Sequence, residues 1–239
     1  ALTASLTHPH PRIRFLATDI IREMVERLAA GEEDFVLEPK VFPPEVAELF
    51  VTQLPFDKNP DVRARSAPVL AYSTDPRATM VLLTLLGDTE WFVRLHAVRS
   101  IAKRKFLSQA SQTAQRLTDP HWMVREATAR TLLVFGRVGI DQLTAHFLQT
   151  EDRYSREQIA EEMQRAGLIP SLLAQYASEV DGRERRVIEQ LAQMGKTSYI
   201  VEMLEKSPER NLRRKFLEDF GRHPDPRILG WVRRMATQE

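Results

Sequence analysis

Small and apolar residues recur along this chain three, four and seven positions after a set of charged residues. Counted from Arg94, these positions hold Ala97, Val98 and Ile101. The spacing places the three side chains on one face of a helix. The chain is therefore predicted to contain seven similar helices, each beginning near one anchor residue. The other six anchors are Arg14, Arg63, Arg125, Arg156, Glu184 and Arg213.

The anchors lie 31 residues apart in the middle of the chain, and the residues before them repeat as well. Segments 88–94 and 119–125 share an Asp, a Trp, a Val and an Arg at the same offsets. A fixed period of this size is typical of stacked helical repeats. No stretch alternates as a strand does, so we predict an all-α protein of antiparallel helix pairs. The second helices are expected over Pro44–Leu54, Arg77–Leu86, Ser108–Leu117, Ile140–Leu148, Ile169–Ala177, Thr197–Leu204 and Arg227–Met235.

The first two anchors, Arg14 and Arg63, are 49 residues apart, which is longer than one repeat. The helix of the first anchor is expected to be long, over Arg12–Ala30. The sequence that follows it is acidic and contains several prolines. We therefore predict an inserted loop over residues 31–42, for which a solvated spacer is the simplest interpretation.

The repeats differ in regularity along the chain. They are most regular over 57–163 and diverge over 164–239, where Glu184 occupies an Arg position. A single repeat domain over 1–239 is expected, because a repeat array is not limited by one globular core. Both ends cut through a repeat, so we expect a piece of a longer protein. A cytoplasmic location is favoured, although a longer protein leaves room for an upstream signal or membrane anchor.

Composition excludes several kinds of site. The 239 residues contain no Cys, which excludes disulfides, zinc–thiolate sites and thiol nucleophiles. Only nine residues are Gly, and no Gly-rich phosphate loop is present. No run is long and apolar enough to cross a membrane, so we expect no direct membrane insertion by this segment.

The order Asp-Pro-x-x-x-Val-Arg over 119–125, followed by Ala at helical spacing, resembles the HEAT-repeat superfamily. It is most similar to the short bacterial form called HEAT-like or phycobilisome-lyase-like repeats. The resemblance covers nearly the whole chain. It implies a right-handed α-solenoid of about seven antiparallel helix pairs. The helices that begin at Val-Arg would line the inner, concave face of this solenoid.

The resemblance also implies a structural role for the acidic and basic residues of each turn. The turn Asp and the Arg six residues later would bond to the turn of the neighbouring repeat. A carboxylate can accept hydrogen bonds from a guanidinium and from helix N-terminal N–H groups. Thr150 occupies an Asp position, so the series is expected to weaken there. The implied inter-repeat ladder comprises Asp57, Arg63, Asp88, Arg94, Asp119, Arg125 and Arg156.

No residue pattern indicates catalysis. None of the six His residues is followed by Glu, so the metal motif of the di-iron HEAT-repeat hydroxylases is missing. The adjacent acidic pair Glu161-Glu162 is on one helix, where neighbours in sequence face different directions. No nucleophile motif is present. We therefore predict a non-enzymatic protein with no catalytic residue, no cofactor and no metal ion.

Charge is arranged in bands along the sequence. Residues 63–140 contain 12 Lys and Arg but five Asp and Glu, and acidic bands lie on both sides. Arg99 and Arg130 each follow their anchor by five positions, so they should form a row in the concave groove. Such a row attracts an acidic peptide, phosphate groups or nucleic acid. Balanced surface charge for solubility is the alternative interpretation.

Trp91 and Trp122 share one position in successive repeats, which should place them within about 10 Å of each other. They form either a recognition ridge or, as we favour, a contact that fastens one turn to the next. His96 is expected to face the groove. The candidate partner-binding residues are Trp91, His96, Arg99, Lys103, Trp122 and Arg130.

Three functions remain open at this point. The first is a non-enzymatic scaffold that binds a protein partner, acidic or with banded charge, in the concave groove. The second is binding to the nucleic-acid backbone through residues 63–140, which the net charge of only +1 and the flanking acidic bands argue against. The third, a chromophore lyase-type activity, is implied by the resemblance alone.

Overall fold

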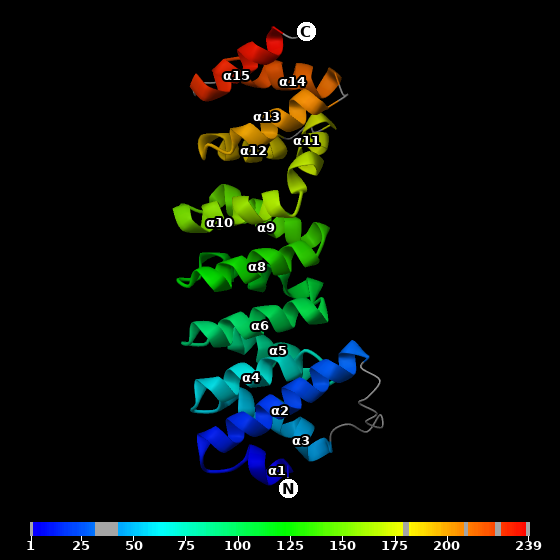
Figure 1. Ribbon diagram of the computed structural model, residues 1–239, viewed down its shortest axis with the longest axis vertical. Coiled ribbons are helices and arrows are strands. Elements are labelled where there is room, and N and C mark those ends of the chain that lie inside the picture. The colour runs from blue at the N-terminus through cyan, green and yellow to red at the C-terminus, as the bar shows by residue number, and fades with distance from the viewer. Residues whose placement is uncertain (1, 32–42, 179–181, 208–209, 223–225, 238–239) are drawn as a thin grey trace. The chain divides into compact units, whose positions relative to one another are not determined.

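The computed structural model describes residues 2–31, 43–178, 182–207, 210–222 and 226–237. These residues form fifteen α-helices and three short 3-10 helices, and none of them lies in a strand (Figure 1). Helix follows helix in antiparallel pairs, as in an α-solenoid. The predicted all-α solenoid class is therefore confirmed.

The chain divides into two compact units, residues 1–143 and residues 144–239. The division falls within α9 (Arg137–Gln149). Both units consist of helix pairs, so the expected single repeat domain stays a prediction. Of the predicted inserted loop, Gly31 closes α2 with a positive φ of 72°, which suits Gly. The remainder, 32–42, lies outside the described residues.

The first unit has two layers of helices. In one layer α2, α4, α6 and α8 pack side by side in chain order, and the shorter odd-numbered helices lie beside them. The first layer comprises α2 (Pro11–Ala30), α4 (Pro60–Leu70), α6 (Trp91–Arg104) and α8 (Trp122–Val134). The other comprises α1 (Leu2–Leu6), α3 (Pro44–Thr52), α5 (Arg77–Leu85) and α7 (Ala110–Ala114).

The predicted helix over Ser108–Leu117 is broken into three short pieces. The α-helical part is α7, which lies between the 3-10 helices η2 (Leu107–Gln109) and η3 (Gln115–Thr118). A third 3-10 helix, η1 (Leu54–Phe56), follows α3. Within this segment the hydroxyls of Thr113 and Thr118 donate to the backbone carbonyls of Gln109 and Gln115, so side chains compete for backbone acceptors.

The core of the first unit is built from the periodic apolar positions. In α6 the residues Ala97, Val98 and Ile101 are completely buried. The residue three positions after the anchor, Ala97 in α6, is small and lets neighbouring helices approach closely. Thr128 fills this position in α8, where it is also buried, and its hydroxyl donates to the carbonyl of Val124 at 2.7 Å. The polar side chain is thus satisfied within its own helix.

The second unit has an aromatic core. Tyr176, Phe216 and Phe220 are all buried, and the two Phe rings stack at 4.3 Å between centroids. The Tyr176 hydroxyl donates to the Asp219 carboxylate at 2.6 Å. Burial and this carboxylate raise the pKa of Tyr176. The helices of this unit are α10 (Arg153–Arg165), α11 (Leu168–Ser178), α12 (Arg183–Gln193), α13 (Thr197–Lys206), α14 (Arg210–Phe220) and α15 (Pro226–Ala236).

Guanidinium–carboxylate pairs, largely removed from solvent, join successive turns of the first unit. In each pair the arginine Nε and Nη2 donate to the two oxygens of one aspartate, at 2.6 to 2.8 Å. Both nitrogens point in a fixed direction, so the contact also sets the register between repeats. The pairs are Arg14–Asp57, Arg63–Asp88 and Arg94–Asp119.

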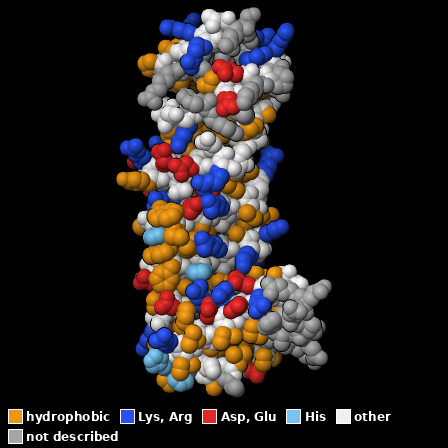
Figure 2. Space-filling model, viewed as in Figure 1, with side chains coloured by type: hydrophobic (Ala, Val, Ile, Leu, Met, Phe, Trp, Pro, Cys, Tyr) orange, Lys and Arg blue, Asp and Glu red, His pale blue; other side chains and the backbone are white. Residues whose placement is uncertain are grey.

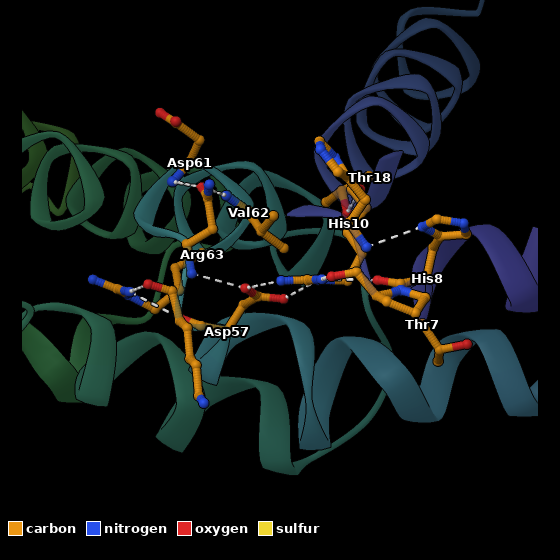
Figure 3. A network of polar contacts seen from close by, with 12 residues as sticks. Thr7, His8, His10, Thr18, Asp57, Asp61, Val62 and Arg63 are labelled. Carbon is orange, nitrogen blue, oxygen red and sulfur yellow. Dashed lines mark hydrogen bonds and ion pairs between the residues drawn. The ribbon is translucent and has the colours of Figure 1, made fainter. Parts of the chain in front are cut away.

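Each arginine also holds its own turn. Nη1 of Arg63 donates to the carbonyl oxygen of Asp57 at 2.8 Å, and Arg94 and Arg125 make the equivalent bond. The Asp57 carboxylate in turn accepts from the backbone N–H of Asn59, whose side chain caps α4 (Figure 3). One aspartate thereby connects a neighbouring helix, a turn and a helix start.

Within the described residues, Arg94–Asp119 is the last pair of this series. The residue 25 positions after Arg125 is Thr150, which has no carboxylate. Nε of Arg125 is buried and has no hydrogen-bond partner in the described part of the chain. In the second unit Arg156 donates to the carbonyl of Thr150. The last pair therefore lies close in sequence to the division between the two units.

Substitution Asp119→Ala should destabilise the first unit by about 3–5 kcal/mol, because it leaves the buried Arg94 charge without its carboxylate. The side chain of Asp119 has no exposed area and that of Arg94 is 10% exposed. The measurement is urea unfolding followed by circular dichroism. Asp61→Ala is the matched control, since Asp61 is exposed in the first turn of α4. Equal loss in both variants would contradict a role for the buried pair.

Acid should weaken the same contacts. Burial opposes ionisation of Asp57 and Asp88, but the paired guanidinium and a backbone N–H keep the pKa of each carboxyl below its ordinary value. A folded-state pKa below the unfolded value of about 3.9 gives stability that is present above that pH and lost below it. The unfolding midpoint should therefore fall as pH drops below about 4. In Asp57→Asn this acid-dependent loss should be smaller, and an unchanged loss would refute the assignment.

Candidate interaction face of the first unit

Charged side chains from four neighbouring helices gather on one surface of the first unit, which we call the charged face. Each of its residues is exposed or half-buried. In Figure 2 red and blue side chains lie side by side over the region of α2, α4 and α6. The charged face comprises Asp19, Arg22 and Glu26 of α2, Arg65 of α4, His96, Arg99 and Lys103 of α6, and Glu126 and Arg130 of α8.

Ion pairs link α2 to the next two helices of the layer. Asp19 accepts from Arg22 at 2.8 Å within its own helix and from Arg65 of α4 at 3.1 Å. Glu26 accepts from Arg22 and from Lys103 of α6, the latter at 3.2 Å. Acidic residues of α2 thus lie directly against basic residues of α4 and α6.

Lys103 is more constrained than the sequence suggested. Besides its ion pair with Glu26, its Nζ donates to the Tyr72 hydroxyl at 3.1 Å and lies 5.2 Å from the centre of that ring. Arg130 pairs with Glu126 on its own helix at 2.6 Å. Among the cations of the charged face, and within the described residues, Arg99 alone has no ion-pair partner. The predicted basic row is therefore partly neutralised.

His96 lies within this group of cations. Burial first, and then the positive charges of Arg65, Arg99 and Arg22, lower its pKa to about 4, and the charge of Glu26 opposes this shift. The imidazole is therefore neutral near pH 7. It offers one donor and one acceptor nitrogen beside the unpaired guanidinium of Arg99.

An aromatic stack lies at the start of α6 and α8. The Trp91 ring is parallel to the His121 ring, with 3.8 Å between centroids, and His121 also stacks on Trp122 at 6.3 Å. Trp91 is half-buried, whereas Trp122 is 54% exposed. Trp91 therefore contacts His121 at the turn of the next repeat, and Trp122 presents an aromatic surface to solvent.

The structure thus places the candidate residues in two groups. His96, Arg99 and Lys103 are on one side of α6, and Arg130 occupies the position equivalent to Arg99 in α8. Trp91 and Trp122 belong to the aromatic stack at the helix starts. The two groups share α6 and α8.

Sequence reasoning missed Asp19, Glu26 and His121. A signal for Asp19 was present, because it follows Arg14 by five positions, as Arg99 follows Arg94. A comparison of equivalent positions in all repeats would have shown that Asp19 occupies the same position in its repeat as Arg99 and Arg130 do in theirs. His121 directly precedes Trp122, 30 residues after Trp91, but its stacking depends on how the repeats are offset in space.

The described part of the chain contains no group of three His, Asp or Glu side chains arranged to hold a metal ion. No helix in it has both the length and the apolar character needed to cross a membrane.

Comparison with known proteins supports the repeat assignment. Residues 47–132 match the sequence model of HEAT repeats, so the predicted resemblance is confirmed over this stretch. The sequence has no significant match among curated proteins.

Two solved structures resemble the chain as a whole. One is an engineered protein at 18% identity and a TM-score of 0.47, covering 98% of this chain and 96% of its own. The other is the complex of CpcE and CpcF of phycocyanin lyase from Nostoc sp. PCC7120, at 17% identity and a TM-score of 0.48, covering 98% and 93%. Likeness at this level carries no weight on function.

The pKa of His96 provides a test of the charged face. Its ring-proton signal in NMR should titrate with a midpoint near pH 4. Arg99→Glu should raise this midpoint, because it replaces a repelling positive charge with an attracting negative one. Arg130→Glu is the matched control, since Arg130 is not among the charges acting on His96. A midpoint that responds equally to both substitutions would mean that His96 and Arg99 are not neighbours.

Proposed function

Because residues 47–132 match the sequence model of HEAT repeats, we propose that this chain is a non-enzymatic scaffold that binds a protein partner on the charged face. Stacked repeats bury their apolar sides against one another and leave an extended surface formed by one helix of each pair. The observation that carries the proposal is the unpaired Arg99 beside a neutral His96, within a surface otherwise ordered by ion pairs.

Pre-ordered charge favours recognition. Arg22 and Arg65 are held by Asp19, and Lys103 is held by Glu26 and Tyr72. Side chains that are already fixed lose little conformational entropy when a partner binds. Arg99 is then the cation left to receive an acidic side chain. Arg residues, and exposed aromatic residues such as Trp122, are common centres of binding energy in protein interfaces.

The mixture of charges argues for a protein rather than a nucleic acid. A nucleic-acid backbone carries a negative charge at every phosphate. On the charged face it would be repelled by Asp19, Glu26 and Glu126, which lie among the Lys and Arg side chains. A protein segment can place a basic residue opposite these acids and an acidic residue opposite Arg99. Electrostatic complementarity of this kind sets partner choice and orientation. The partner should therefore carry both signs of charge, with an acidic group facing Arg99.

A chromophore lyase-type activity is the remaining alternative from the sequence, and it rests on family resemblance. No geometry in the described residues favours it over binding. The proposed scaffold role requires no reacting group, cofactor or metal ion.

Charge reversal tests the proposal. The double variant Arg99→Glu with Arg130→Glu should reduce recovery of the bound protein from a lysate of the source by about tenfold or more, because like charges would face each other. The matched control is Lys58→Glu with Arg137→Glu, which changes the net charge equally at exposed positions away from the charged face. Equal recovery with both double variants would refute this face as the binding site.

The same experiment separates protein from nucleic acid. The lysate is treated with nuclease before capture, and duplex and single-stranded probes are titrated with salt in parallel. Retention of the partner after nuclease supports the proposal. A bound species that nuclease removes, with probe affinity falling steeply as salt rises, would replace it with backbone binding.

A further inference from the structure

A polar pocket opens between α10 and α12 in the second unit. Its volume is about 470 Å³, within the range of small-ligand sites. It belongs entirely to this unit and is separate from the charged face. The pocket is lined by Arg153, Arg156, Glu157, Gln190, Gln193 and Met194.

Arg156 is an anchor arginine, and three anchor arginines of the first unit each bind an aspartate carboxylate. It follows Arg125 by one repeat of 31 residues. In three equivalent positions of the first unit, the arginine Nε donates to an aspartate oxygen at 2.6 Å. Nε of Arg156 is buried but has no hydrogen-bond partner in the described residues. Its Nη2 donates to the carbonyl of Thr150, so the guanidinium is held in place by its own turn.

The repeat that follows Arg156 differs in length and in its anchor from the repeats of the first unit. The next anchor after Arg156 is Glu184, only 28 residues later, and it is an acid rather than an arginine. The residue 25 positions after Arg156, where the earlier repeats have their aspartate, is Asp181. Asp181 lies outside the described residues, and an Asp181 variant therefore belongs among the tests of the site.

The charge around the pocket favours an anion. Arg153 is exposed at its edge and makes no ion pair in the part of the chain that the structure describes. The Glu157 carboxylate is 3.4 Å from Lys196 Nζ, so these two charges offset each other. Among the described residues, no carboxylate then pairs with the guanidinium groups of Arg153 and Arg156.

The remaining lining residues suit an organic anion. The side-chain amides of Gln190 and Gln193 can donate to further oxygens, and Met194 offers an adaptable apolar wall for methylene groups. A planar guanidinium binds a carboxylate with two parallel hydrogen bonds, which fits the geometry of the three Arg–Asp pairs of the first unit.

We propose that this pocket binds a carboxylate, with Arg156 as the buried donor and Arg153 as the second cation. The carboxylate comes from a small polycarboxylate or from an acidic side chain of a bound protein. This site is independent of the proposed scaffold role, because its residues and its test do not involve the charged face.

The Arg156 Nε–H signal in a proton–nitrogen NMR spectrum tests the proposal directly. A hydrogen bond to a carboxylate moves such a signal downfield, and Arg14, Arg63 and Arg94 supply carboxylate-bound reference signals in the same molecule. Citrate represents the small ligand and a hexaglutamate peptide represents the acidic side chain. Binding of either probe should move the Arg156 signal toward the references, and the stronger probe identifies the source. No movement with either probe would overturn the proposal.

Variants separate a built site from general charge effects. Arg153→Gln should weaken probe binding at least tenfold, and Arg156→Lys, which keeps the charge but removes Nε–H, should do the same. Arg186→Gln is the matched control, because Arg186 is exposed on α12 and does not line the pocket. Equal weakening by Arg186→Gln, or equal binding of sulfate at the same concentration, would refute a specific carboxylate site.

One further variant excludes an internal ligand. If Asp181 already fills the pocket, the Arg156 signal will lie at the reference position without any probe, and Asp181→Asn will shift it upfield. That result would overturn the proposal. An Arg156 signal unaffected by Asp181→Asn and moved by a probe supports an open carboxylate site.

Discussion

The buried pairing of an arginine with the aspartate of the next turn is the contact on which the first unit depends. A guanidinium largely removed from water is stabilised by a carboxylate that accepts from both of its nitrogens, and the fixed directions of these two bonds favour one register between neighbouring repeats. The pairs Arg14–Asp57, Arg63–Asp88 and Arg94–Asp119 repeat this geometry with nearly identical distances. Equivalent residues of successive helices therefore line up across the layer.

This alignment turns sequence periodicity into surface chemistry. Arg99 and Arg130 occupy the same position in neighbouring helices, and Asp19 occupies it in the first. The column therefore changes sign along the layer, and α2 supplies acids that neutralise cations of α4 and α6. A binding surface with fixed ion pairs and one uncommitted guanidinium results. Where the series of pairs ends, the same guanidinium chemistry is left facing the pocket of the second unit.

Much of the fold could be predicted because helix formation is local. The long first helix was expected over Arg12–Ala30 and spans Pro11–Ala30, since its apolar period and its terminal Gly31 are both written in neighbouring residues. The helix expected over Ser108–Leu117 was wrong in detail, because its polar side chains break the regular backbone pattern. The contacts of the candidate residues were harder to predict, because Lys103 donates to Glu26, which lies 77 positions earlier in the sequence.

The sequence by itself determined the all-α class, the repeat length and which residues share a position, because a helical period and a repeat can both be read along the chain. Only the tertiary structure decided that Lys103 pairs with Glu26 while Arg99 has no ion pair among the described residues. It also decided that His121 stacks on two indoles and that Arg156 lines a pocket. The reason is that hydrogen bonds and ion pairs act over a few ångströms in space. Their partners are set by how helices distant in sequence are placed against one another.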